Sequence, residues 1–397
     1  MRNTLPTAPP AGFTSYGSGP EFFRQVHAFF MSTQESELTR WKYEYTTLDR
    51  MMILRRVENY EFILTRFCDS TSVHDIPNAS GVKGGCGVCR TYHDGCPQEH
   101  ADVGFANGQM VPPGPHVMLG SGLNCMVQPK CVKRGGFLAR LEALFANRSK
   151  LVSKADLFMP DACNMPFVER DAQGRVLLYM AYRFGLYIDF LLARGALAAN
   201  RTSTVLEIGA GWGGFAGLVK QMLPQTRYII LDIPTSLPLQ MSYAHHLGYR
   251  CLTLADTSGE AAEQRQHVKA LLRRGDFDFL FILPHQIELL PDRSVSLAVN
   301  LDSMVEMPAA ALSHYMLHIK RLSNAFYANN RMGHHNGWPS FRKLVTWMLN
   351  NDTQWRLEYD EQATRMATSV RESTYKMVDH VMMVGKHREM FLRRVAE

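Results

Sequence analysis

Residues 205–214 read Val-Leu-Glu-Ile-Gly-Ala-Gly-Trp-Gly-Gly, and this stretch decides the fold. A mostly apolar run leads into four glycines, and an apolar helical face follows with Phe215, Leu218 and Val219. Glycines allow positive φ angles and let a ligand approach where a Cβ would clash. The N-terminus of the next helix offers free N–H groups to an electron-rich ligand. The order of strand, glycine turn and helix therefore predicts a nucleotide-type cofactor site.

Acidic residues before and after this turn narrow the kind of cofactor. Three of the glycines also satisfy the dinucleotide fingerprint G-x-G-x-x-G, so an NAD(P)-dependent oxidoreductase is an alternative. Glu207, two residues before the first glycine, suits a ligand with a cationic amino-acid head better than a pyrophosphate. Asp232 ends the next apolar run, where an acid accepts hydrogen bonds from a ribose diol. We therefore expect the cofactor to be bound by Glu207, Gly209, Gly211, Gly213, Asp232 and Ile233.

Composition is that of an ordinary globular protein. The chain has 397 residues, 46% of them apolar, which is enough for one or two domains with a sizeable core. A net charge of +6 without a dense basic block leads us to expect no nucleic-acid partner. The N-terminus shows no secretory signal, and charged residues interrupt the apolar run 176–199, so we expect no membrane partner. Eight cysteines then favour reduced thiols and a cytoplasmic location.

Three regions follow one another along the chain. Residues 1–20, rich in Pro, Gly, Ser and Thr, predict a flexible tail. Residues 21–175 form an expected helical N-terminal region, with a Cys- and Gly-rich insert at 68–135 that lacks periodicity. We expect this region to cover the acceptor pocket and to support a homodimer. Residues 176–397 are expected to form the cofactor-binding domain.

In the third region strand-like and helix-like segments alternate, which is typical of a parallel α/β sheet. A buried helix is expected within 176–199, and two antiparallel strands, Trp355–Tyr359 and Met377–Val384, are expected to close the sheet. The expected parallel strands are 203–208, 227–232, 278–283, 295–300 and 324–328. The expected helices between them are 213–223, 236–247, 309–322 and 339–350.

Several motifs of this region resemble those of known methyltransferases. The string E-x-G-x-G-x-G resembles motif I of the class I S-adenosylmethionine (SAM) methyltransferases. The further motifs LDIP (231–234), LPHQIELLPD (283–292), NLDSMVEM (300–307) and FYANNR (326–331) resemble the sugar O-methyltransferase family over roughly residues 176–385. The resemblance implies an α/β, Rossmann-like sheet, parallel with antiparallel C-terminal strands, that binds SAM. It also implies methyl transfer to a hydroxyl of a sugar, a glycosylated or a polyhydroxylated small molecule.

The resemblance also implies roles for residues after the third and fourth strands. The junction after the third strand lies over the adenine in class I methyltransferases, so Gln286 is expected at the ring edge and His285 or Ile287 on its face. Asn300, Asp302 and Glu306 follow the fourth strand, where Asn300 borders the cofactor and the acceptor approaches.

A sugar hydroxyl is a poor nucleophile, so methyl transfer calls for a general base within hydrogen-bond reach. The candidates are His334 and His335 in a glycine-containing loop, and the carboxylates Asp302 and Glu306. Histidine has a suitable intrinsic pKa, and the loop is able to act as a lid. Asp302 with another acid is instead able to hold Mg²⁺, and the sequence does not select between base and metal ligand.

The insert contains one candidate zinc site. Cys86, Cys89, His93 and Cys96 offer four ligands for a tetrahedral zinc ion. Two separate pairs of ligands are more usual, so reduced cysteines in a loop are the stronger interpretation. A zinc-containing binding protein with a vestigial methyltransferase fold is therefore a further alternative.

Overall fold

The computed structural model describes residues 137–160, 169–177, 179–211, 213–233, 236–254, 260–332, 337–362 and 387–395, with short strands at 14–15, 105–106 and 109–110. Apart from Thr14–Ser15, the expected tail lies outside these residues, as do the expected N-terminal helices and the zinc candidates Cys86, Cys89, His93 and Cys96. The general-base candidates His334 and His335 also lie outside them.

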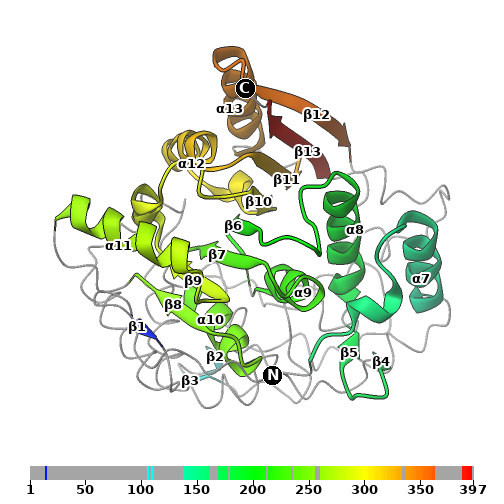
Figure 1. Ribbon diagram of the computed structural model, residues 1–397. Helices are drawn as coiled ribbons and strands as arrows, with labels where there is room; N and C mark the ends of the chain where they lie inside the picture. The colour runs from blue at the N-terminus through cyan, green and yellow to red at the C-terminus, as the bar shows by residue number, and fades with distance from the viewer. Residues whose placement is uncertain are drawn as a thin grey trace.

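A nine-stranded mixed sheet forms the centre of the described structure (Figure 1). In spatial order, the six strands from β8 (Cys251–Thr253) across to β11 (Ala325–Arg331) pair in parallel. In contrast, β13 (His387–Arg394) is antiparallel to both β11 and β12 (Trp355–Gln362). The α/β fold expected from the sequence, a parallel sheet with antiparallel C-terminal strands, is therefore confirmed. The spatial order is β1 (Thr14–Ser15), β8 (Cys251–Thr253), β9 (Phe279–Ile282), β7 (Arg227–Leu231), β6 (Thr204–Ile208), β10 (Leu297–Leu301), β11 (Ala325–Arg331), β13 (His387–Arg394) and β12 (Trp355–Gln362).

Helices cover both faces of the sheet, which buries the parallel strands on both sides and explains their continuous apolar runs. One face packs against α8 (Tyr179–Ala193), α9 (Gly214–Met222) and α10 (Leu237–His246). The other packs against α11 (Ala261–Arg274), α12 (Ala309–Leu322) and α13 (Gly337–Asn351). Shorter elements are α7 (Phe137–Arg148), η3 (Lys154–Leu157), η4 (Pro284–Leu289), η5 (Met304–Glu306), and the hairpins β2 (Phe105–Ala106)–β3 (Gln109–Met110) and β4 (Glu169–Arg170)–β5 (Val176–Leu177).

The apolar run 176–199 contains the expected buried helix, α8, which is 15 residues long. One of its charged residues, Asp189, connects α8 to the preceding loop. Asp189 accepts hydrogen bonds from the Ser149 hydroxyl and from the backbone N–H groups of residues 150–152, so it ties the loop after α7 to α8. No helix in the described part of the chain has the length and apolarity to cross a membrane.

Three elements differ from the sequence-based expectation. The strand that lies between β11 and β12 is His387–Arg394, whereas the expected segment Met377–Val384 lies outside the described residues. Charged residues obscure β13 in the sequence, although His387, Glu389 and Phe391 on one of its faces are buried. The short strand β8 and the polar helix α11 were not predicted.

Candidate functional site

The glycine turn lies where the strand order reverses. β6 is flanked by β7 on one side and β10 on the other, so the chain winds outward from it in both directions. Open α/β sheets bind ligands at this switch point, beyond the carboxyl ends of the strands. Gly209, Gly211 and Gly213 have φ angles of 73°, 60° and 86°, and Gly213 caps α9. A Cβ on Gly211 would meet no atom within 4 Å, so the turn is open at this point.

Asp232 lies beside the turn at the end of β7. Its side chain is 8% exposed and accepts hydrogen bonds from the backbone N–H of Ile233, at 2.8 Å, and from the amide of Gln240. Gln240 also donates to the carbonyl of Gly211, at 2.8 Å. Burial raises the pKa of Asp232 to about 6, against the effect of these hydrogen bonds. The sequence gave no signal for Gln240, which joins the acid to the glycine turn from α10.

Glu207 is a buried carboxyl group below the turn. It is 1% exposed, and the Tyr228 hydroxyl donates to its Oε2 at 2.8 Å. The pKa of Glu207 is raised to about 8. Burial is the main cause, the Tyr228 hydrogen bond opposes it, and the nearby Asp232 charge adds to it. The group is therefore mostly protonated at neutral pH in the absence of a cation.

The other side of the turn is hydrogen-bonded to the end of β10 and the loop after it. The Ser303 hydroxyl donates to the carbonyl of Ile208 at 2.9 Å, and the Asn300 amide donates to the same carbonyl at 2.7 Å. The Asn300 side-chain oxygen in turn accepts from the N–H of Met304. Asn300 is completely buried and its side chain supports the turn, while its expected place beside the cofactor stays a prediction.

The junction after β9 is likewise held by its own side chains. The Gln286 side chain accepts from the N–H of Leu283 at 2.9 Å and donates to the carbonyl of Leu254 at 2.6 Å. Ile287 is completely buried within the apolar core on the α11–α12 face. Gln286 and Ile287 therefore hold the junction together, and the adenine-edge and ring-face roles expected for them stay predictions. His285 is exposed and still borders this edge of the sheet.

Polar groups also gather where β10 and β11 end. Asp302 has a φ of 67°, a left-handed conformation that Asp tolerates better than most residues, and its N–H donates to the carbonyl of Asn329 at 2.8 Å. Its carboxylate Oδ2 lies 3.8 Å from Nε2 of His387, which is 1% exposed. Nδ1 of His387 lies 2.9 Å from the Asn329 side-chain oxygen, so Nδ1 is the donor and Nε2 faces Asp302.

The side chains of the other predicted base candidates lie outside the described residues. Glu306 lies in η5, and its side chain is outside the described residues, as are His334 and His335. His387 was missed by sequence reasoning because the last strand was placed at 377–384. Its antiparallel pairing sets it opposite Arg331, which brings the start of β13 to the carboxyl end of β11.

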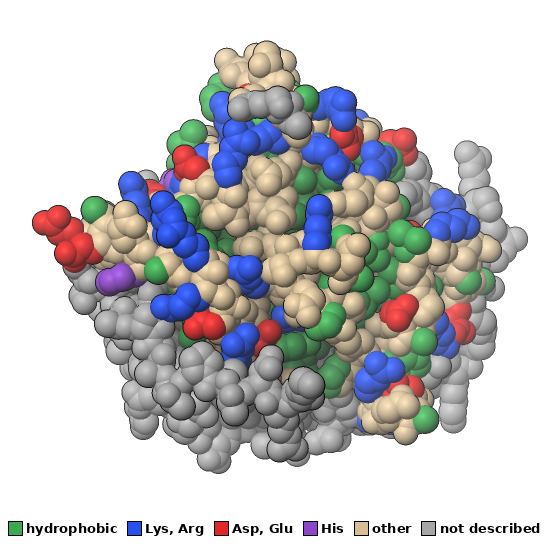
Figure 2. Space-filling model, viewed as in Figure 1, with side chains coloured by type: hydrophobic (Ala, Val, Ile, Leu, Met, Phe, Trp, Pro, Cys, Tyr) green, Lys and Arg blue, Asp and Glu red, His purple; other side chains and the backbone are tan. Residues whose placement is uncertain are grey.

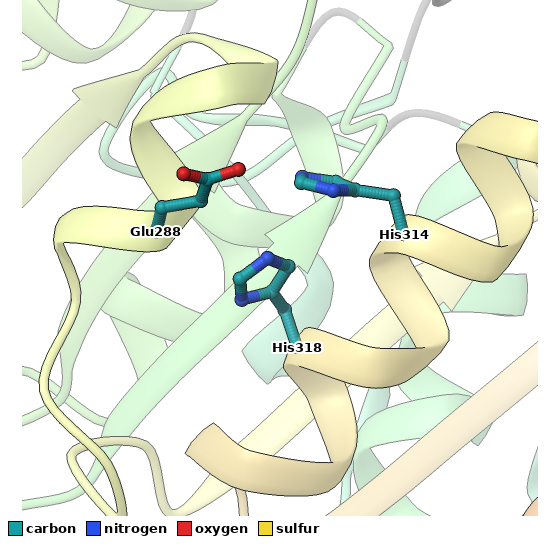
Figure 3. Close-up of side chains that lie close together, drawn as sticks. All are labelled: Glu288, His314 and His318. Atoms are coloured by element: carbon teal, nitrogen blue, oxygen red, sulfur yellow. The ribbon is translucent and has the colours of Figure 1, made fainter.

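A second cluster lies away from this edge, between η4 and α12 (Figure 3). Glu288, His314 and His318 each place one potential metal-ligating atom within 4.8 Å of the others. However, Nε of Arg321 donates to Nδ1 of His318 at 2.8 Å, so Nε2 carries the imidazole proton. Metal-bound histidines instead donate their second N–H to an acceptor. Burial and the charge of Arg321 also lower the pKa of His318 to about 3, and this positive surrounding disfavours a cation.

On the side shown in Figure 2, charged side chains do not gather into a single patch. Basic side chains there are distributed over several elements, with acidic side chains between them. This distribution agrees with the solvated charge expected from a net charge of +6.

No family model and no curated protein matches the sequence. Among solved structures the chain is similar to geranyl diphosphate C-methyltransferase from Streptomyces coelicolor A3(2), with 11% identity, a TM-score of 0.33, and coverage of 66% of this chain and 100% of that one. It is also similar to a geranyl diphosphate methyltransferase bound to sinefungin, with 12% identity, a TM-score of 0.33, and coverage of 55% and 82%. For TrmK of M. capricolum the identity is 9%, the TM-score 0.28, and the coverage 52% and 68%. These similarities are too low to transfer a function.

Proposed function

We propose that this chain is a SAM-dependent O-methyltransferase acting on a hydroxyl of a sugar, a glycosylated or a polyhydroxylated small molecule. One observation carries the proposal. The open glycine turn, two buried acids and a polar pair that includes a histidine lie at the carboxyl ends of neighbouring strands in one sheet.

The donor set of the turn suits SAM. Gly211 leaves space for a ligand against the backbone, and the buried Asp232 carboxylate beside it is an acceptor that ribose hydroxyls would share with the Gln240 amide and the backbone N–H groups already bonded to it. The buried carboxyl of Glu207 has no fixed cation in hydrogen-bond contact, and a ligand ammonium near it would favour its ionised form. A pyrophosphate at the same turn would bring this carboxyl group no cation, so the NAD(P) alternative lacks that stabilisation.

Bound SAM supplies an electrophilic methyl group on its sulfonium. The protein then has to align the acceptor oxygen with that carbon and remove a proton from the oxygen. Asp302 is suited to the second task, because its carboxylate is partly exposed at the edge of the sheet. His387, held through Nδ1 by Asn329, presents Nε2 to Asp302 and stabilises a proton taken up there.

Calorimetry with SAM, S-adenosylhomocysteine and NADH tests the cofactor. SAM is expected to bind and NADH to fail, and Asp232→Asn should weaken SAM binding by about tenfold or more, since two ribose hydrogen bonds to a charged group are altered. Asp292→Asn is the matched control, because this carboxylate is exposed and lies beside Arg321. NADH binding without SAM binding would overturn the proposal.

Turnover tests the acceptor class. Purified protein and SAM are incubated with a panel of methyl glycosides, sugar nucleotides and glycosylated small molecules, and methylated products are identified by mass spectrometry. The proposal expects O-methylated products from this panel. Methyl transfer only to nitrogen or carbon acceptors in a parallel panel would contradict it.

A further inference from the structure

Arg183 on α8 is a buried charged group for which the described residues provide no ion-pair partner. Its side chain is 7% exposed, and neither Nε nor Nη1 has a hydrogen-bond partner among these residues. The Arg183 guanidinium carbon lies 5.8 Å from the centre of the Phe184 ring, a contact that leaves its N–H groups unsatisfied. Burying a guanidinium without an acceptor is costly, and arginine cannot avoid the cost by losing its proton.

The position of Arg183 follows from the face of α8 on which it lies. Arg183, Tyr187, Phe190 and Arg194 are spaced by four, three and four residues, so they form one stripe along the helix. The Tyr187 and Phe190 rings lie 5.8 and 5.6 Å from the Tyr327 ring of β11. The stripe therefore faces the last parallel strand of the sheet.

The direction of α8 places Arg183 at the carboxyl edge. At the other end of the stripe, the carbonyl of Arg194 accepts a hydrogen bond from Arg393, which pairs with Ala325 at the start of β11. Eleven helical residues extend about 16 Å, and the seven-residue strand β11 extends about 20 Å. Arg183 consequently lies near the level at which β11 ends, the level of Asn329.

The residue next to Arg183, Phe184, packs against the helix after the glycine turn. Its ring contacts Phe215, with ring centres 5.8 Å apart, and Phe215 belongs to the first turn of α9 directly after the glycines. The neighbour of Arg183 thus contacts the helix that follows the glycine turn, while the stripe that contains Arg183 contacts β11, the strand whose end carries Asn329.

We propose that Arg183 binds an anionic oxygen group, a carboxylate or phosphate, at the boundary between the cofactor and acceptor parts of the site. Two sources fit this chemistry: the carboxylate of the SAM amino-acid group, or an anionic group of the acceptor. The guanidinium is planar and offers paired N–H donors that match either group. The first source rests on the proposed function, whereas the second does not require SAM.

The variants Arg183→Met and Arg183→Lys test this proposal, with Arg201→Met as the control. Arg201 is an exposed arginine whose guanidinium donates to the carbonyl of Gly195. Without ligand, Arg183→Met should unfold at an equal or higher temperature than the wild type, because the charge it removes has no ion-pair partner among the described residues. A structural role of Arg183 would instead lower the unfolding temperature of this variant.

Calorimetry then compares S-adenosylhomocysteine with 5′-methylthioadenosine, which lacks the amino-acid group. If the cofactor supplies the anion, Arg183→Met weakens S-adenosylhomocysteine binding about 10- to 100-fold and leaves 5′-methylthioadenosine binding unchanged. Arg183→Lys should give an intermediate loss, because it keeps the charge but not the paired donors. Arg201→Met should match the wild type with both ligands.

Thermal stabilisation by millimolar inorganic phosphate tests the second source, an anionic group of the acceptor. If the acceptor supplies the anion, phosphate stabilises the wild type and Arg201→Met but not Arg183→Met, while S-adenosylhomocysteine affinity is unchanged. The proposal is overturned if Arg183→Met alters neither ligand's binding. A wild type that binds neither adenosyl compound contradicts the proposed function, and the phosphate comparison then decides the role of Arg183 alone.

Discussion

Two glycines of the same turn are expected to respond differently to the same substitution. Gly209 and Gly211 both have positive φ, so alanine at either position costs about 1–2 kcal/mol of backbone strain. At Gly209 the added Cβ would also lie 2.1 Å from the Ser303 hydroxyl oxygen and 2.5 Å from its Cβ. At Gly211 it would meet nothing within 4 Å.

The clash at Gly209 determines the size of the difference. Ser303 has to move, which breaks its hydrogen bonds with the carbonyl of Ile208 and with the Asn300 amide. Each is worth about 1 kcal/mol, so Gly209→Ala should lower the free energy of unfolding by about 3–4 kcal/mol in total. Gly211→Ala should lower it by about 1–2 kcal/mol. For a domain of this size the unfolding temperature should fall by about 10 °C and about 4 °C, respectively.

SAM affinity should respond most directly to the substitution that has the smaller effect on stability, Gly211→Ala. Gly211→Ala remains folded but places a methyl group where the ligand is proposed to approach, so calorimetry should show SAM binding at least about tenfold weaker. A double-mutant cycle checks the cause of the Gly209 effect. Because Ser303→Gly removes the same hydrogen bonds, the double variant should be about 2 kcal/mol more stable than additivity predicts. Equal stabilities of the two alanine variants, or wild-type SAM affinity of Gly211→Ala, would refute this reasoning.

Three further outcomes are expected. Since the pKa of Glu207 is raised to about 8 by burial, SAM binding at pH 7 should release about one proton, and Glu207→Gln should abolish the release. Calorimetry in two buffers of different ionisation enthalpy measures this, and no release by the wild type would contradict it. Asp189→Ala leaves three backbone N–H groups without their acceptor, so urea unfolding should show a loss of about 3 kcal/mol with unchanged SAM affinity. Asp302→Asn should keep the left-handed backbone and SAM binding but lower kcat about 100-fold; an unchanged kcat would exclude Asp302 as the base.

The strand–turn–helix unit could be predicted because its signals are local. Parallel strands buried on both faces leave continuous apolar runs, and positive φ angles at Gly209, Gly211 and Gly213 require a residue without a Cβ. The five parallel strands expected from such runs were each found within a few residues of their expected limits. Asp232 was placed for the same reason, since it directly follows a run of this kind.

The sequence was least informative where a polar side chain is used by the fold itself. The sequence shows that Gln286 is polar and follows a strand, but not that the backbone groups of Leu283 and Leu254 occupy its amide. In β13 the buried His387 lies between charged residues whose pattern does not identify a strand. Its position depends on antiparallel pairing with β11, a long-range contact without a local signal. Arg183 appeared in the sequence only as an interruption of an apolar run.

The electrostatics of the proposed cofactor site favour a ligand that carries both signs of charge. Glu207 is buried with its pKa raised to about 8, so its ionised form lacks a stabilising cation. Arg183 belongs to the helical layer on the same face of the sheet and lacks an acceptor for Nε and Nη1 among the described residues. An amino-acid head group supplies an ammonium for the first and a carboxylate for the second. A neutral ligand would relieve neither cost, and a pyrophosphate would relieve only that of Arg183, because it brings no cation to Glu207. Selectivity for SAM over a dinucleotide then follows from two unsatisfied groups in the protein, beyond the shape of the glycine turn.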